Sequence, residues 1–211
     1  MSVAAPWRLL VFARVPRPGR VKTRLIPTLG AAAATDLYRQ LLARTLHHAA
    51  ALPGVARELW WDDAPAAEQP DAELAGRLGF RQRLQPGGDL GERMAHALQQ
   101  TLRDGQGAIL IGTDCPDCDA AYLQAAGAAL YDHDAVLGPA LDGGYVLIGL
   151  RQFAPQVFTA IPWGTDQVLA HTRQRLRSLG WCWKELAARR DVDRPEDLAH
   201  YPELLPAAEF V

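Results

Sequence analysis

The chain has 211 residues, of which 49% are hydrophobic and 22% charged, a balance typical of a globular domain and not of a disordered or fibrous protein. Its formal charge of −2 removes the general attraction that nucleic acid or an anionic membrane requires. The longest apolar runs, such as residues 108–111, are far shorter than the roughly 20 residues of a membrane span, so we expect a cytoplasmic protein with no nucleic-acid and no membrane partner.

The first half of the chain alternates strand and helix patterns. Leu9–Phe12 is a short apolar run typical of a strand. After a basic loop, Ala31–Ala51 has the periodicity of an amphipathic helix. Glu58–Trp61 and Arg81–Leu84 indicate two more strands, and Leu90–Leu102 predicts a helix because its apolar residues recur on one face.

The second half begins with the strongest strand signal. Ala108–Ile111 is uninterrupted and apolar, which is typical of a central strand buried on both faces of a parallel sheet. Asp119 is expected to cap a helix that runs through Leu123–Leu130. Ala135–Leu137 and Tyr145–Leu150 indicate two strands joined by a short Asp-Gly-Gly turn.

The last predicted element is a long helix that Thr165 caps and that stops at Gly180. Strands separated by helices of this length predict an α/β fold, with a mostly parallel sheet covered by helices on both faces in a three-layer α/β/α arrangement. The segment Asp62–Asp71, rich in Pro, Ala and acid, is expected to be a surface loop too short to separate domains. We therefore expect one domain over residues 1–211.

In an open α/β sheet, ligands bind beyond the carboxyl ends of the strands. After the first strand, residues 14–24 contain five cations: Arg14, Arg17, Arg20, Lys22 and Arg24. Such a loop can neutralise a polyphosphate, with arginines donating paired hydrogen bonds and lysine acting as a point charge. It lacks the glycine spacing of a P-loop, and a solvated basic loop explains the same residues equally well.

Carboxylates follow the central strand. Asp114 is the first of them, and Mg²⁺ favours one or two protein carboxylates together with substrate phosphate oxygens. Asp117 and Asp119 have simpler explanations as turn and cap residues. Asp114 is therefore the expected magnesium ligand at this edge of the sheet.

Cys115 and Cys118 form a C-x-x-C pair between a strand and a helix, a place where redox-active cysteines occur. The alternative of redox or metal-thiolate chemistry stays open, although a lone pair of this kind is weak for zinc. With Cys182 the chain has three cysteines, and an odd number suits a reducing compartment better than a disulfide framework.

Three further segments are ambiguous alone. Asp142–Tyr145 places an acid beside two glycines that let a substrate approach the backbone, but it also has the signal of an ordinary hairpin turn. Asp193 with Glu196 fits a capping box before a helix. The glycine-rich segment Gln85–Gly91 enters a helix and could hold a base or a ribose.

Together these segments occur in the order found in one family: Phe12–Pro16 through Lys22–Leu25, Gly88–Met94, Gly112–Pro116, Gly138–Pro139 to Asp142–Tyr145, Pro162–Thr165 and Asp191–Asp193. In these motifs the chain resembles the nucleotide-diphospho-sugar transferase (GT-A) superfamily. Within it, the chain looks like the radical-SAM/selenodomain-associated transferase 1 family, which is similar to 2-phospho-L-lactate guanylyltransferase. The resemblance covers most of the chain, from about residue 9 to residue 198.

The resemblance implies a single nucleotide-binding domain of GT-A type. Its implied nucleotide-binding residues are Arg14, Lys22, Thr23 and Arg24 for the phosphates, with Gln85, Gly88 and Asp89 for the nucleoside. Asp114 and Asp193 are the implied ligands of Mg²⁺ or Mn²⁺, and Lys22, Arg14 and Asp114 are the implied catalytic residues.

The acceptor is expected to meet Asp142, Gly143, Gly144, Tyr145, Trp163 and Thr165. The segments that hold these residues are absent from the lactate enzyme's pattern, so the acceptor should differ from that of the lactate enzyme. Core packing explains Trp163 about as well as a place in the acceptor site does.

The leading hypothesis is a Mg²⁺-dependent nucleotidyltransferase. A small phosphorylated acceptor would attack the α-phosphorus of a nucleoside triphosphate and release pyrophosphate, a reaction that depends mostly on positioning and charge neutralisation. The first alternative is a glycosyltransferase with a nucleotide-sugar donor, in which Asp117-x-Asp119 is a D-x-D metal motif. A second is a non-catalytic nucleotide-binding partner of a redox system, which requires a thiol pKa well below about 8.5 at Cys115 or Cys118.

Overall fold

The computed structural model describes residues 5–66, 68–103 and 107–205. Within these residues seven strands form one sheet in the order β3-β2-β1-β4-β6-β5-β7. The strands are β1 (Trp7–Ala13), β2 (Ala56–Trp61), β3 (Arg81–Leu84), β4 (Gly107–Ile111), β5 (Ala135–Pro139), β6 (Tyr145–Leu150) and β7 (Trp183–Glu185). The expected α/β class with a mostly parallel sheet is confirmed.

The helices are α1 (Ile26–Leu29), α2 (Ala31–Ala50), α3 (Pro70–Arg77), α4 (Leu90–Leu102), α5 (Ala120–Asp132) and α6 (Val168–Ser178). Short 3₁₀ helices span Thr23–Leu25 (η1), Pro155–Val157 (η2), Pro195–His200 (η3) and Pro202–Leu204 (η4). None of the helices in the described part of the chain is both long and apolar enough to cross a bilayer.

The direction of the strands determines where a site can form. Strand β1 pairs in parallel with β2 and β4, and β2 pairs in parallel with β3. Strand β6 runs antiparallel to both β4 and β5, as the predicted hairpin between β5 and β6 requires. The carboxyl ends of β1, β2, β3 and β4 therefore lie along one edge of the sheet.

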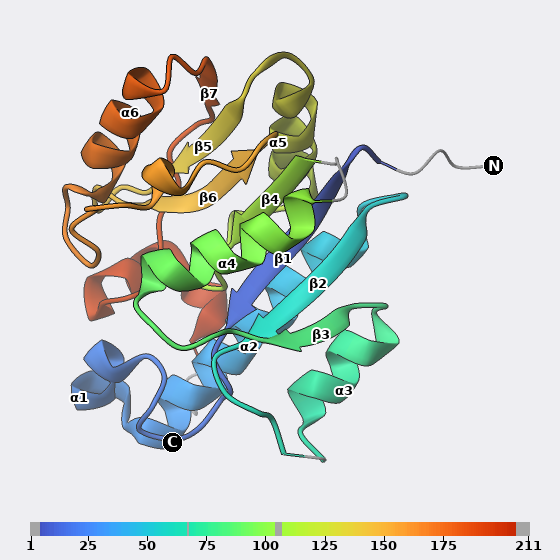
Figure 1. Cartoon of the computed structure of the whole chain (residues 1–211). Coiled ribbons are helices and arrows are strands. Elements are labelled where there is room, and N and C mark those ends of the chain that lie inside the picture. The colour runs from blue at the N-terminus through green and yellow to red at the C-terminus, as the bar shows by residue number, and fades with distance from the viewer. Residues whose placement is uncertain (1–4, 67, 104–106, 206–211) are drawn as a thin grey trace, which may run out of the picture.

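Alternation along the strands sorts the core into two layers. In β1, Leu9 and Val11 face a cluster that includes residues of α2, α3 and α5, whereas Leu10 and Phe12 face a cluster that includes residues of α4 and α6. Figure 1 shows α4 crossing the front of the sheet while α2 runs behind it. These are the three layers that the sequence predicts.

A third apolar cluster joins the two ends of the chain. Leu25, Leu37 and Leu41 from the first loop and α2 pack against Val192 and against residues of η3 and η4. In Figure 1 the red C-terminal segment accordingly lies beside the blue α1 and α2. This packing brings the segment around Val192 to the edge of the sheet where β1 and β4 end.

Two predicted caps are wrong, and one predicted loop is shorter than expected. Thr165 does not cap α6, because its hydroxyl donates to the Pro162 carbonyl (2.8 Å) and the helix begins two turn residues later without a side-chain cap. Asp193 does not cap η3; Asp197 accepts the free N–H groups there instead. The expected loop 62–71 ends in helix α3, whose first residue is Pro70.

Candidate functional site

The centre of the candidate site is the ammonium group of Lys22, on the loop after β1. Its side chain is 3% exposed and contacts the carboxylates of Asp114, from the loop after β4, and Asp193, from the C-terminal segment. The ammonium also donates to the Val192 carbonyl at 2.6 Å. The structure thus brings together three predicted site residues that are up to 171 positions apart.

A buried ammonium group is stable only where its charge and all its donors are compensated. The three N–H groups of Lys22 have three acceptors, which are Asp114, Asp193 and the Val192 carbonyl. Burial alone would lower the pKa of Lys22, but the two carboxylates reverse that effect and raise the pKa. Lys22 is therefore charged, and it ties the two carboxylates together.

The loop that carries Lys22 is fixed at its root by Tyr38 of α2. The Tyr38 hydroxyl accepts from the backbone N–H of Arg14 (2.8 Å) and from the hydroxyl of Thr113 (3.2 Å), and it donates to the Arg14 carbonyl (3.2 Å). The ends of β1 and β4 are thereby linked through one buried phenol. Lys22 itself has a left-handed backbone (φ 46°), a strained conformation for a residue other than glycine.

Asp191 is a site residue that the sequence analysis missed. Its pKa is raised to about 8, first by burial and then by the charges of Asp114, Asp142 and Asp193, with Lys22 acting in the opposite direction. The signal was present, because Asp191 stands in the same Asp-Val-Asp motif as the predicted ligand Asp193. The charges of Asp114, Asp142 and Asp193 therefore all act on Asp191, although only Asp114 and Asp193 contact Lys22.

The two predicted metal ligands suit a hard cation. Both carboxylates are well exposed (46% for Asp114 and 42% for Asp193), although each also touches buried Lys22. Within residues 5–66, 68–103 and 107–205, no group of three or more His, Cys, Asp or Glu side chains is arranged to hold a metal ion. Mg²⁺ does not need such a cage, since it usually takes one or two protein carboxylates and completes its shell with water and phosphate oxygens.

The other cations of the first loop differ in their surroundings. Arg24 is 63% exposed and donates to the outer oxygen of Asp193 (3.2 Å). Arg14 is exposed, and its guanidinium makes a long hydrogen bond to the Arg20 carbonyl (3.4 Å). Thr23 is exposed at the start of η1. Arg14, Thr23 and Arg24 thus face solvent on the loop that carries Lys22, where a ligand can reach them.

The predicted nucleoside segment has structural contacts of its own. The Gln85 amide donates to the carbonyls of Trp60 (2.8 Å) and Ala13 (3.4 Å), and it accepts from Arg93 (3.0 Å). Asp89 caps α4 in a reciprocal capping box with Glu92. Gly88 precedes that cap with φ 111°. The segment therefore joins the start of α4 to the carbonyls of β1 and β2.

The predicted acceptor residues come together on the other side of the site. Gly143 lies so close to the Asp166 carbonyl that a Cβ atom would be 2.1 Å from it, and its own carbonyl accepts from the backbone N–H of Leu169 (2.9 Å). Asp142 accepts from the backbone N–H of Gly144 (2.9 Å) in the turn between β5 and β6. The turn and the loop before α6 therefore form one surface.

Trp163 joins this surface to α4. Its ring lies edge-on to Tyr145, with centroids 6.4 Å apart, and its indole packs directly on Gly91 in the first turn of α4. A Cβ atom at Gly91 would be 2.3 Å from the indole nitrogen. Packing thus explains Gly91, and Trp163 forms a wall between the predicted nucleoside segment and the predicted acceptor turn.

We expect Gly91→Ala to lower the free energy of unfolding by about 1–3 kcal/mol, because the new methyl group overpacks the contact with Trp163. Urea unfolding measures this change. The matched control is Gly76→Ala in α3, where the methyl group has room and a helical alanine stabilises by about 0.5–1 kcal/mol. In a Trp163→Ala background Gly91→Ala should cost almost nothing; an undiminished cost there would contradict the assigned contact.

Asp197 holds the Asp193 loop in place. One of its carboxylate oxygens accepts from the backbone N–H groups of Asp193 (3.1 Å) and Arg194 (2.8 Å), and the other accepts from Arg190 (3.3 Å). These hydrogen bonds lower the pKa of Asp197 although burial acts in the opposite direction. Asp197 is a positioning residue, because it orients the backbone of a predicted metal ligand without facing the site.

We expect Asp197→Ala to lower the free energy of unfolding by about 1–2 kcal/mol, as the loss of a helix cap does, and also to weaken the binding of Mg²⁺ with a nucleoside triphosphate. Thermal unfolding and titration calorimetry measure the two effects. Asp119→Ala is the matched control, because Asp119 caps α5 by accepting from the backbone N–H of Tyr122 (2.8 Å). Equal weakening of nucleotide binding in both variants would contradict a positioning role.

The two cysteines do not have the properties that the redox hypothesis requires. Burial, followed by the negative charge of Asp191, raises the pKa of Cys115 to about 12. Burial also raises the pKa of Cys118 well above its ordinary value. At neutral pH both groups are thiols and not reactive thiolates, so the low pKa that the redox hypothesis predicts is wrong.

Comparisons with known proteins identify the family of the chain and its fold. A family model described as an uncharacterized protein conserved in bacteria (DUF2064) matches residues 45–165. No curated protein matches the chain. A candidate nucleotide-diphospho-sugar transferase from Desulfovibrio desulfuricans G20 is 33% identical, with a TM-score of 0.84 over 98% of this chain and 90% of that one.

More distant structures share the fold. A CMP:2-keto-3-deoxy-manno-octonic acid synthetase, solved with CTP, is 12% identical with a TM-score of 0.56 over 94% of this chain and 97% of that one. An inositol-1-phosphate CTP transferase from T. maritima is 14% identical with a TM-score of 0.52 over 96% of each chain. At these identities the likeness extends to the fold, while the finer resemblance to 2-phospho-L-lactate guanylyltransferase stays a prediction.

Proposed function

Because the chain belongs to the DUF2064 family of bacterial proteins and has the fold of nucleotide-diphospho-sugar transferases, we propose that it is a Mg²⁺-dependent nucleotidyltransferase. An oxygen of a phosphorylated acceptor attacks the α-phosphorus of a nucleoside triphosphate, the bond from that phosphorus to the bridging oxygen breaks, and pyrophosphate leaves. The acceptor phosphate is already ionised, so no base is needed to remove a proton from it.

The observation that carries this proposal is the contact of Lys22 with Asp114 and Asp193 at the carboxyl edge of β1 and β4. Asp114 and Asp193 would hold Mg²⁺ (or Mn²⁺), which when bound would neutralise charge on the triphosphate. Lys22 keeps the two carboxylates together. Arg14 and Arg24 are exposed beside them and can donate to phosphate oxygens.

The acceptor is proposed to lie against the surface formed by the turn after β5 and the loop before α6. There Trp163 supplies an aromatic wall, and Gly143 lets the turn pack closely against the Asp166 carbonyl. Catalysis of this kind rests on holding the two phosphates in line and on offsetting their charge. This edge of the sheet has a cationic side with Arg14 and Arg24 and an aromatic side with Trp163. A small phosphorylated molecule can contact both.

A glycosyltransferase is the second candidate, because the relative from Desulfovibrio desulfuricans G20 is described in terms of nucleotide-diphospho-sugars. The D-x-D interpretation of Asp117 and Asp119 loses support, however. Asp117 accepts from the Tyr201 hydroxyl (2.7 Å) and Asp119 caps α5. Both carboxylates are thus used within the fold, and neither contacts Lys22.

The test is a thermal-shift panel of nucleoside triphosphates and nucleotide-sugars, each with and without Mg²⁺, followed by product analysis. A ligand at about 100 times its Kd stabilises the fold by about 2.7 kcal/mol. A Mg²⁺-dependent shift with a triphosphate, together with pyrophosphate release, supports nucleotidyl transfer. A shift confined to nucleotide-sugars, with release of a nucleoside diphosphate, replaces the proposal by the glycosyltransferase. No shift with any of them overturns both.

A further inference from the structure

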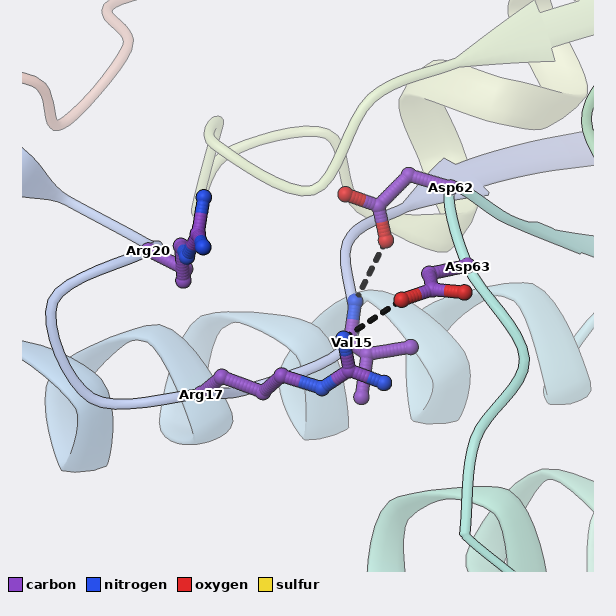
Figure 2. A pocket seen from close by; sticks show the side chains of 5 residues that line it. All are labelled: Val15, Arg17, Arg20, Asp62 and Asp63. Atoms are coloured by element: carbon purple, nitrogen blue, oxygen red, sulfur yellow. Dashed lines mark hydrogen bonds and ion pairs between the residues drawn. The ribbon is translucent and has the colours of Figure 1, made fainter. Parts of the chain in front are cut away.

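A cavity of about 220 Å³ lies beside the candidate site, between the loops that follow β1 and β2. It is lined by Val15, Arg17, Arg20, Asp62 and Asp63, and Figure 2 shows these side chains around it. Pockets for whole drug-sized ligands begin at about 300 Å³. This cavity therefore fits one ring system and not a complete nucleotide.

The walls of the cavity differ in charge. Arg17 is neutralised, because its guanidinium donates to Asp63 (2.5 Å) and to the Ala64 carbonyl (3.2 Å). One oxygen of Asp62 accepts from the backbone N–H of Val15 (2.8 Å). In Figure 2 its second oxygen points away from Val15, toward the side where Arg20 lies.

Arg20 supplies the opposite wall. Among the described residues its guanidinium has no hydrogen-bond or ion-pair partner; only its backbone is engaged, with Arg17 and Arg14. A guanidinium donor and a carboxylate acceptor therefore face the cavity from two sides. A free phosphate would meet the charges of Asp62 and Asp63, whereas a neutral ring with both acceptor and donor groups satisfies both walls.

The loop after β1 that lines the cavity also carries Lys22 of the candidate site. Arg20 is two residues before Lys22, and the Arg20 carbonyl accepts from the guanidinium of Arg14. Asp62 directly follows β2, and its backbone N–H donates to the Ala13 carbonyl at the end of β1 (2.9 Å). A molecule with phosphates at Arg14 and Arg24 can place its ring in this cavity, because Arg14 contacts the loop of Arg20.

We infer that this cavity binds the base of the nucleotide and that Asp62 selects bases which carry an exocyclic amino group. The inference rests on the proposed function. It places the residue that selects the base outside the predicted nucleoside segment. In that segment the Gln85 amide already donates to two carbonyls and is not free to bind a base. The amino group donates to the free oxygen of Asp62, and Arg20 donates to the acceptor atoms of the base.

The test is calorimetric binding of two matched pairs of nucleotides in the presence of Mg²⁺: CTP against UTP, and GTP against ITP. In each pair only the first base has the amino group in question. We expect the full-length protein to bind one amino-bearing nucleotide at least about tenfold more tightly than its partner, the worth of a hydrogen bond to a charged group.

Asp62→Asn is the decisive variant, because asparagine keeps an oxygen for Val15 and replaces the free oxygen by an N–H donor. The preference within the pair should vanish or reverse. Arg20→Gln changes an exposed position and should lower the affinity for the preferred nucleotide. Asp36→Asn is the control, since Asp36 lies on α2 and pairs with Arg39 (3.0 Å) away from the cavity.

The outcomes separate this inference from the proposed function. If wild type binds triphosphates but shows no preference within either pair, or if Asp62→Asn weakens both members of a pair equally, the base lies elsewhere and the inference fails while the proposed function stands. If wild type binds none of the four nucleotides and no ATP either, the proposed function itself fails. A preference that Asp62→Asn abolishes and Asp36→Asn retains establishes the cavity as the base site.

Discussion

Replacing Asp114 by asparagine should lower turnover at least about 100-fold, which corresponds to a barrier increase of roughly 2.7 kcal/mol. The side chain keeps its size but loses the charge that faces Lys22 and, in the proposal, Mg²⁺. Initial rates of pyrophosphate release over a range of Mg²⁺ concentrations measure the effect. The variant should also need more Mg²⁺ for half-maximal rate.

Asp117→Asn is the matched control for Asp114→Asn. The two residues share one loop, but the Asp117 carboxylate accepts from the Tyr201 hydroxyl and does not face Lys22. Turnover of Asp117→Asn should stay within a few-fold of wild type. If Asp114→Asn also stays within a few-fold, Asp114 is not the metal ligand, and the assignment of the site to this edge loses its main support.

Replacing Lys22 by methionine should lower the free energy of unfolding by about 1–3 kcal/mol, because the Val192 carbonyl loses its donor and two half-exposed carboxylates lose their counter-ion. The side chain is 3% exposed and sits between two carboxylates, so its loss leaves their repulsion uncompensated. Chemical denaturation measures the change.

The sequence contains one other lysine, Lys184, which provides the control. It is exposed on β7, and Lys184→Met should change stability by less than about 0.5 kcal/mol. A double-mutant cycle tests the cause. Asp193→Asn should cost less in the Lys22→Met background than in wild type, because one repulsive charge is removed. Additive effects would show that Lys22 and Asp193 do not act together.

The strands that carry the site could be predicted because each is a short apolar run between turn residues. Strand β4 is the clearest example, with four of its five residues buried. Strand β7 could not be predicted in the same way. It has only three residues, none of them fully buried, and it exists because β5 offers it a parallel partner. Helix α3 was missed because its acids and its proline suggest a loop, although Ala75 is fully buried.

The site shows a similar division. Asp114 and Lys22 could be located from the rule that ligands meet the carboxyl ends of strands. The Asp89-x-x-Glu92 spacing is that of a capping box and could have identified this cap from the sequence. The function of Asp197 as an anchor depends on which backbone N–H groups lack partners, which only the folded chain reveals. The contact between Lys22 and the Val192 carbonyl joins residues 170 positions apart, and no local pattern predicts it.

That contact has a consequence for the order in which the protein acquires its site during synthesis. Six of the seven strands precede residue 151, so most of the sheet can assemble while the ribosome is still producing the rest of the chain. Lys22 is then an ammonium group with only one of its two carboxylates. The site closes when the segment from Asp191 to Leu204 emerges and packs on α2, so a nascent or truncated chain without that segment has a sheet but no finished site.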